Sequence, residues 1–196
     1  MSAQTGSKLF IVSGPSGAGK GTLVTKLMEH FPDLKLSVSA TTRPIRRDET
    51  AGRDYHFMSE EEFEQKRIRG EFLETARVHN YRYGTLYEEV KRDLLAGRDV
   101  ILEIDVQGAL QVKNKISDSV LIFIEPPSIR ELEERLKQRK TETPKDISTR
   151  IGAAEEEMKA APQYDYVIVN DDIEGAAAQL IGIVEKERAR ATTINI

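Results

Sequence analysis

The stretch KLFIVSGPSGAGK, residues 8–20, decides which fold this chain is expected to adopt. Its first half, from Lys8 to Ser13, is a short apolar run that predicts a buried β-strand. Its second half is a glycine-rich turn that ends at Lys20. Beyond the turn, apolar side chains recur at three- and four-residue spacing as far as Pro32, which predicts a helix from about residue 19 to residue 30. A strand, a tight turn and a helix therefore follow one another directly.

The turn has the spacing Gly14-x4-Gly19-Lys20, which is that of a phosphate-binding P-loop. Glycines let main-chain N–H groups surround an anion, and the helix start adds the positive end of its dipole. The motif carries Ser or Thr directly after the lysine as a magnesium ligand, whereas here Gly21 precedes Thr22. We therefore expect the metal to be held differently, for example through water. A glycine-rich turn without a ligand is the competing interpretation.

The rest of the chain alternates between apolar runs and helix signals. Short strands are expected over residues 36–42, 72–78, 99–105, 120–124 and 166–169. Helices are expected from the capping boxes Ser59/Glu62 and Ser128/Glu131, over 87–96, from Thr143-Pro144, and over 173–190. Continuous apolar strands separated by helices predict an α/β, three-layer fold with a central parallel sheet. Residues 39–85 break this rhythm and are interpreted as an inserted α+β subdomain, and the acidic run Glu155 to Glu157 as a solvated helix face.

Composition excludes several classes of function. The 196 residues are enough for one sizeable core, and the lack of cysteine excludes disulfides, thiolate metal sites and a catalytic thiol. A net charge of −4 argues against a nucleic-acid partner, and no apolar stretch approaches the roughly 20 residues of a membrane span. We expect a cytoplasmic protein with small-molecule substrates. The sequence leaves the choice between monomer and homo-oligomer open.

Over about residues 8–190 the chain resembles guanylate kinases. The matching stretches, in the order of that family, are GPSGAGK (14–20), SVSATTR (37–43), GRDY (52–55), YGT (83–85), IDVQG (104–108) and VIVNDD (167–172). The resemblance implies transfer of the γ-phosphate of ATP, with Mg²⁺, to GMP and also to dGMP, in purine nucleotide metabolism and GMP recycling. It also implies a core of about 1–36, 88–127 and 160–196, a GMP-binding subdomain of about 37–87, and a helical lid of about 128–159.

The resemblance also assigns the acceptor site. It implies that the GMP phosphate is held by Ser39, Arg43, Arg46, Tyr55 and Tyr83, and that guanine faces Glu74, Thr85 and Asp105. These residue types suit their tasks, because guanidinium forks saturate a phosphate and a carboxylate accepts from the N1–H and amine of guanine. Each residue also has a plain interpretation. The arginines could form a solvated loop face, the tyrosines ordinary strand aromatics, and Glu74 the outward side of an edge strand.

The donor site follows from the P-loop and from arginines further along the chain. ATP is expected on Gly14, Pro15, Ser16, Gly17, Ala18, Gly19, Lys20, Gly21, Thr22 and Asn170, and catalysis is expected from Lys20, Arg43, Arg135, Arg139 and Arg150. Arg135 and Arg139 are spaced i,i+4 and so share a helix face, although a surface pairing with nearby glutamates would explain them equally. No residue is assigned as a direct metal ligand, with Thr22 or Asp105 as candidates through water. The role of Glu103 is left open.

Three other functions compete with this interpretation. The chain could phosphorylate a different nucleoside monophosphate, but Glu74 and Thr85 favour guanine as the base. It could be a protein-binding module of guanylate-kinase shape, yet it keeps Lys20 and the arginines together. It could also be an NTPase that uses water, which would leave Tyr55, Glu74 and Tyr83 unexplained.

Overall fold

The computed structural model describes residues 6–78, 80–138, 144–190 and 196. Its main sheet has five parallel strands in the order β2-β7-β1-β8-β9. These strands are β1 (Leu9–Ser13), β2 (Lys35–Leu36), β7 (Val100–Glu103), β8 (Val120–Glu125) and β9 (Tyr166–Val169). The predicted α/β fold with a central parallel sheet is confirmed, and β1 lies at its centre.

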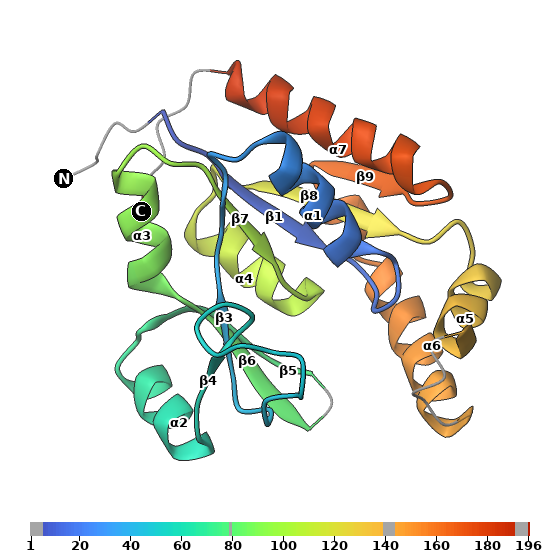
Figure 1. Cartoon of the computed structure of the whole chain (residues 1–196), viewed down its shortest axis with the longest axis horizontal. Helices are drawn as coiled ribbons and strands as arrows, with labels where there is room; N and C mark the ends of the chain where they lie inside the picture. The colour runs from blue at the N-terminus through green and yellow to red at the C-terminus, as the bar shows by residue number, and fades with distance from the viewer. Residues whose placement is uncertain (1–5, 79, 139–143, 191–195) are drawn as a thin grey trace.

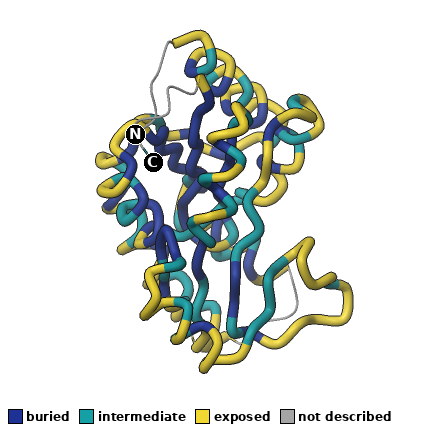
Figure 2. The backbone as a smooth tube through the Cα atoms, turned by 90° about the vertical axis from the view of Figure 1, so that its left-hand side faces the viewer, coloured by how far each residue is buried: buried dark blue, intermediate teal, exposed yellow. Residues whose placement is uncertain are grey.

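Helices cover both faces of this sheet (Figure 1). Phe10 and Val12 of β1 pack with α1 (Lys20–His30) and α7 (Ile173–Arg188) on one face. Leu9 and Ile11 point the other way and pack with α3 (Tyr87–Leu95) and α4 (Val106–Lys115). Alternate residues of one strand thus supply two separate cores, as expected for a strand that is buried on both faces. Figure 2 shows the buried backbone concentrated in these central strands.

A second, four-stranded sheet lies beside the main one, in the order β4-β3-β6-β5. Its strands are β3 (Ser39–Thr41), β4 (His56–Phe57), β5 (Phe72–Val78) and β6 (Tyr81–Leu86). The helix α2 (Glu60–Ile68) packs on it, with the rings of Phe63 and Phe72 stacked at 4.5 Å. The capping box of Ser59 and Glu62 opens this helix as predicted.

The expectation of a single strand over residues 36–42 is wrong in one respect, because in the structure this segment is divided between the two sheets. β2 pairs with β7 of the main sheet, and Ser37 N–H still donates to Ile101 O at 3.0 Å. From Ser39 onward the chain pairs with β6 instead. This segment therefore connects the two sheets.

Two further helices, α5 (Ile129–Gln138) and α6 (Pro144–Met158), form a small unit with its own apolar contacts. Leu132 and Leu136 of α5 pack against Ala154 of α6. Ser128 caps α5 by accepting from Glu131 N–H at 3.1 Å, and a short 3₁₀ turn (Ala161–Gln163) leads from α6 to β9. Figure 1 shows this helical pair beside the main sheet, at some distance along the molecule from the second sheet.

Two details depart from the sequence-based expectations. β9 is an edge strand and only partly buried, since Val167 and Val169 are 43% and 41% exposed. The helix α4 was not expected, because Gly108 and two β-branched valines weaken its propensity and its cap, Asp105, was interpreted only as a site residue. Within the described part of the chain, no helix has both the length and the apolar character needed to cross a membrane.

Candidate active site

The P-loop joins the end of β1 to the start of α1. Gly14 and Gly19 have φ angles of 136° and 94°, a region that side chains rarely adopt. Both positions are also crowded: a Cβ on Gly14 would lie 2.0 Å from Ile124 O, and one on Gly19 would lie 2.3 Å from Asn170 Nδ2. Glycine is therefore required here by backbone conformation and by packing together.

Polar side chains from two places in the chain hold the loop. Lys20 Nζ donates to Gly14 O at 2.6 Å and to Pro15 O at 3.0 Å, so its side chain folds back over the loop. Asn170, which follows β9 and is 4% exposed, donates through Nδ2 to Ala18 O at 2.7 Å. The loop is thus held by its own lysine and by a side chain at the end of β9.

Two of the predicted arginines reach the same region. Arg150 of α6 donates to Ser16 Oγ at 3.1 Å. Arg135 of α5 donates to Asn170 O at 3.0 Å and to Glu131 Oε1 at 3.2 Å. The expected surface pairing of Arg135 with a nearby glutamate is therefore present, and Arg135 also contacts the loop that follows β9. Arg139 lies outside the described residues.

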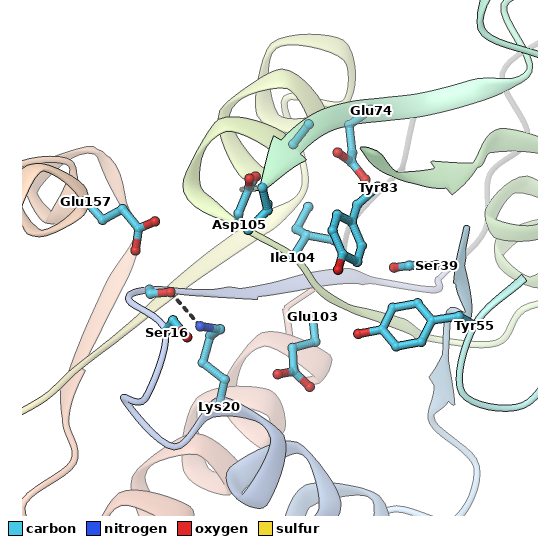
Figure 3. Close-up of a pocket in the computed structure, with 13 residues that line it drawn as sticks. Ser16, Lys20, Ser39, Tyr55, Glu74, Tyr83, Glu103, Ile104, Asp105 and Glu157 are labelled. Atoms are coloured by element: carbon cyan, nitrogen blue, oxygen red, sulfur yellow. Dashed lines mark hydrogen bonds between the residues drawn. The ribbon is translucent and has the colours of Figure 1, made fainter. Parts of the chain in front are cut away.

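A cavity of about 250 Å³ opens in front of the P-loop and extends to the second sheet. Figure 3 shows side chains from both sheets pointing into it. Its lining comprises Gly14, Ser16, Lys20, Ser39, Tyr55, Glu74, Ala76, Val78, Tyr83, Glu103, Ile104, Asp105 and Glu157. A phosphate loop and a set of polar side chains on a separate sheet thus share one space.

Glu74 of β5 lines the cavity and forms a buried pair with Thr85 of β6, which is not itself a lining residue. Glu74 is 3% exposed and Thr85 is fully buried, and Thr85 Oγ1 donates to Glu74 Oε1 at 2.8 Å. The two residues are cross-strand partners, next to an irregularity between Phe72 and Glu74. The pKa of Glu74 is raised to about 7, mainly by burial and also by the charge of Asp105, while the Thr85 hydrogen bond acts in the opposite direction. The interpretation of Glu74 as an outward-pointing edge residue is wrong.

Asp105 lies next to this pair at the N-terminus of α4. Its Oδ1 accepts from Gly108 N–H at 2.7 Å, which makes Asp105 the N-cap of the helix. Burial raises the pKa of Asp105, while its hydrogen bond from Gly108 and the charge of Lys20 act in the opposite direction. A single carboxylate therefore both caps α4 and lines the cavity.

The aromatic and arginine cluster predicted for a phosphate lies at the second sheet, with Tyr83 on β6 and with Arg43 and Tyr55 in the connection between β3 and β4. Arg43 is 8% exposed and makes a two-pronged pair with Glu49, at 2.6 and 3.0 Å. Its guanidinium carbon lies 5.3 Å from the centre of the Tyr55 ring, and the Tyr55 and Tyr83 rings are 6.0 Å apart. The solvated-loop interpretation is therefore wrong for Arg43, whereas Arg46 is exposed. Neither arginine is among the residues that line the cavity.

Two charged cavity residues were not predicted as parts of the site. Glu103 is the last residue of β7, and burial raises its pKa while the charge of Lys20 lowers it. Glu157 of α6 was interpreted as part of a solvated face, but it is half-buried, lines the cavity, and its pKa is raised by burial. Its spacing of seven residues from Arg150, two helical turns, is the sequence signal that could have revealed it. Gly21 and Thr22 are exposed and do not line the cavity.

No group of three or more His, Asp or Glu side chains that could hold a metal ion occurs in the part of the chain that the structure describes. The separate carboxylates of Glu103 and Asp105 suit a cation that is already bound to phosphates and keeps much of its water, as Mg²⁺ does.

A doubly covered parallel sheet, a P-loop between β1 and α1, and a polar cavity in front of them together define a P-loop nucleotide-binding protein. A model of the guanylate kinase family matches residues 6–187, and the chain belongs to this family.

Individual relatives agree with this assignment over nearly the whole chain. The chain is 47% identical to the guanylate kinase of Caldanaerobacter subterraneus, covering 97% of this chain and 92% of that protein. It is 50% identical to the guanylate kinase of Ralstonia nicotianae, with 93% and 82% covered. The crystal structure of guanylate kinase from Anaplasma phagocytophilum superimposes with a TM-score of 0.79 at 33% identity, covering 99% of this chain and 92% of that one.

Proposed function

We propose that this protein transfers the γ-phosphate of ATP to GMP, giving ADP and GDP. The observation that carries the proposal is that one cavity contains both the P-loop lysine, Lys20, and the buried carboxylate of Glu74. The first marks where donor phosphates bind, and the second offers acceptor oxygens to a base. Because both groups line the same space, a donor and an acceptor bound to them would meet inside it.

Guanine is the base that suits the buried pair. Its N1–H and exocyclic amine both donate, and the ionised carboxylate of Glu74 accepts from them, with Asp105 beside it. The Thr85 hydroxyl, which here donates to Glu74, becomes the donor for guanine O6 once the base occupies the carboxylate. Adenine offers neither N1–H nor O6, so it would leave the buried carboxylate unpaired, and such mismatches discriminate by about 10⁴-fold in polar sites.

The acceptor phosphate binds at Ser39, Arg43, Arg46, Tyr55 and Tyr83. Glu49 already holds Arg43 in place, so the guanidinium needs little reordering to receive a phosphate. Arg46 must swing inward from its exposed position. The residues assigned to GMP contact its base and its phosphate and none is assigned to the 2′-hydroxyl, so dGMP is expected to serve as a second acceptor.

Phosphoryl transfer here requires positioning and charge neutralisation. The acceptor is already an anion, so no general base has to create the nucleophile. Lys20 leaves the carbonyls of Gly14 and Pro15 to contact the donor phosphates, and Arg135, Arg139 and Arg150 neutralise the charge of the transferred group. Mg²⁺ arrives with ATP and supplies further neutralisation when bound, and residues at the P-loop and at the end of β7 would hold it.

The division into parts follows from these roles. Residues of about 37–87 form the GMP-binding subdomain, those of about 128–159 form the lid, and the remaining segments form the core. Both outer parts close over the core when the two nucleotides bind, which keeps water from the γ-phosphate. Solution scattering should show a smaller radius of gyration with ADP and GMP together than with neither; identical profiles would contradict closure.

The experiment that tests the function is a coupled assay of ADP release from MgATP. GMP, dGMP, AMP, CMP and UMP are compared as acceptors, and a reaction without acceptor measures hydrolysis. We expect GMP to exceed every acceptor other than dGMP by several orders of magnitude, with little hydrolysis. Equal rates without an acceptor would favour an NTPase, a different best acceptor would favour another monophosphate kinase, and no turnover would favour a protein-binding module.

A further inference from the structure

The strand β5 contains an extra residue in its pairing with β6. Phe72 is in register with Leu86, whereas Glu74 is in register with the neighbouring residue, Thr85. Leu73, between Phe72 and Glu74, is therefore the extra residue of a β-bulge. Bulges re-aim the side chains beside them and are common next to active sites. This bulge lies directly before the carboxylate that lines the cavity.

The bulge decides which face of the sheet Glu74 occupies. In a regular strand, residues two apart point to the same face, so Glu74 would share the face of Phe72. Instead, the Phe72 ring stacks on Phe63 of α2, while Glu74 points into the cavity (Figure 3). Leu73 itself is buried and packs in the core on the α4 side of the main sheet. Without the extra residue, the carboxylate would face α2 rather than the cavity.

Side chains of α4 hold this part of β5. The strand lies at the edge of the second sheet, and α4 of the core packs against it. Gln111 Nε2 donates to Thr75 O at 2.8 Å, and Thr75 N–H donates to Gln111 Oε1 at 3.2 Å, so one side-chain amide pairs with both main-chain groups as a neighbouring strand would. Lys115 Nζ donates to Leu73 O, the carbonyl of the extra residue, at 2.5 Å. These three hydrogen bonds form the α4 clamp, which holds the backbone on both sides of Glu74.

We propose that Gln111 and Lys115 are positioning residues for base recognition, which fix the bulge in β5 and thereby aim Glu74 at the acceptor base. The inference rests on the proposed function in that guanine is the base from which Glu74 accepts. A slip of one residue in β5 would exchange the two faces of the strand and remove the carboxylate from the cavity. Apolar packing would join α4 to β5 without selecting a register, whereas hydrogen bonds to both neighbours of Glu74 select one.

The test compares two acceptors in Gln111→Met, which has a side chain of similar length and removes two of the three hydrogen bonds. The full chain is assayed with GMP and with inosine monophosphate (IMP), which has the N1–H and O6 of guanine but lacks its amine. We expect the KM for GMP to rise by about tenfold or more, since a displacement on the order of 1 Å can cost about 10²-fold, with the KM for ATP little changed. The ratio of kcat/KM for GMP to that for IMP should fall by about tenfold, because the displaced carboxylate no longer accepts from the amine.

The amide of Thr75 reports on the α4 clamp without any ligand. Its hydrogen exchange, followed by NMR, should be slow in the wild type and faster in Gln111→Met. Lys115→Met should also raise the KM for GMP, whereas Lys115→Arg keeps a donor for Leu73 O and should recover part of the loss. Gln179→Met, at an exposed position of α7, is the matched control and should leave both exchange and kinetics unchanged.

Unchanged GMP kinetics in Gln111→Met, despite faster exchange at Thr75, would overturn the positioning role. Equal losses for GMP and IMP, or an equal rise in the KM for ATP, would also overturn it, because they would indicate general destabilisation. Slow exchange at Thr75 in Gln111→Met would show that the α4 clamp does not hold β5 and would overturn the proposal as well. A wild-type enzyme without GMP turnover would instead refute the proposed function, and the positioning role with it.

Discussion

Gly108 and Glu74 approach each other so closely that a Cβ on Gly108 would lie 2.5 Å from Glu74 Oε2. The same atom would lie 3.3 Å from Asp105 Oδ1. The first turn of α4 therefore forms one wall of the space that holds the Glu74 carboxylate. Gly108 also donates its N–H to Asp105, so its backbone positions one carboxylate while its missing side chain makes room for the other.

We predict that Gly108→Ala weakens GMP recognition specifically. The methyl group must displace Glu74, since the opposing atoms belong to a buried side chain that is hydrogen-bonded to Thr85. The KM for GMP should rise by about tenfold or more, with the KM for ATP little changed, and overpacking should cost about 1–3 kcal/mol in the free energy of unfolding. Steady-state kinetics and urea unfolding measure the two effects.

Gly182→Ala in α7 is the matched control, because no atom lies within 4 Å of a Cβ built there. It should stabilise the protein by about 0.5–1 kcal/mol through helix propensity and leave both KM values unchanged. A Gly108→Ala enzyme with the wild-type KM for GMP would contradict the role assigned to this wall.

Glu74 predicts a pH dependence of base binding. Its pKa is raised to about 7 by burial, so much of the protein carries a protonated Glu74 in neutral solution. The proton blocks the oxygen that accepts from guanine, and affinity should therefore increase as pH rises through 7. Guanosine is the appropriate ligand, since it lacks a phosphate with its own pKa near 6. Its affinity should be about tenfold lower at pH 6 than at pH 8. A flat profile by NMR titration would show that Glu74 ionises normally or does not contact the base.

The buried carboxylate of Glu74, which we propose binds guanine, is expected to lower the free energy of unfolding of the ligand-free protein. Folding raises the pKa of Glu74 from 4.5 to about 7, so the folded state binds more protons than the unfolded state in that range and stability falls as pH rises through it. Above pH 7 the full cost is on the order of 3 kcal/mol. Glu74→Gln should therefore stabilise the ligand-free protein at pH 8 by up to that amount while abolishing GMP binding. Near pH 4.5 the advantage should vanish, and urea unfolding at both pH values checks it. Equal stability at pH 8 would contradict the assignment.

The local parts of the fold could be predicted from sequence because short-range chemistry fixes them. The β1–loop–α1 unit follows from an apolar run, glycines and a terminating proline, and α2 follows from its capping box. The crossing of residues 36–42 from one sheet to the other could not be predicted, because strand propensity does not reveal which neighbour a strand pairs with. The helix α4 was not predicted because its N-cap, Asp105, also lines the cavity and was interpreted only as a site residue.

The same distinction applies to the candidate site. Lys20 could be placed from spacing alone, whereas the guanine assignment of Glu74 and Thr85 came from family resemblance, because their contact depends on β5 and β6 pairing across a hairpin. Glu157 could not be separated from its acidic neighbours without knowing which face of α6 meets the P-loop. The positions of Glu74, Thr85 and Glu157 depend on tertiary packing, which leaves no local pattern in the sequence.

The P-loop is expected to depend for its shape on Asn170, a residue far away in the sequence. Its amide satisfies the buried carbonyl of Ala18, and Asn170→Ala leaves that carbonyl without a donor. We expect a loss of about 1–3 kcal/mol in unfolding free energy and a higher KM for ATP, with the KM for GMP less affected. Asn114→Ala, on the exposed side of α4, should stay within about 0.5 kcal/mol of wild type. Wild-type ATP kinetics in Asn170→Ala would show that the loop keeps its shape unaided.

Replacing Arg150 or Arg139 by alanine should lower kcat and leave GMP binding unchanged. Arg150 contacts Ser16 of the P-loop, and arginines that neutralise a transferred phosphoryl group contribute about 10³-fold or more to kcat. Arg150→Ala and Arg139→Ala should each lower kcat by about that factor and leave the Kd of GMP within about twofold, because neither arginine is assigned to the acceptor. Arg150→Lys should recover only part of the loss, since an ammonium group lacks the planar fork. Arg130→Ala removes an arginine of α5 whose side chain is 88% exposed, and it should leave kcat unchanged. An unchanged kcat in Arg139→Ala or Arg150→Ala would exclude that arginine from the mechanism, whereas a similar fall in Arg130→Ala would indicate a general effect of positive charge on α5.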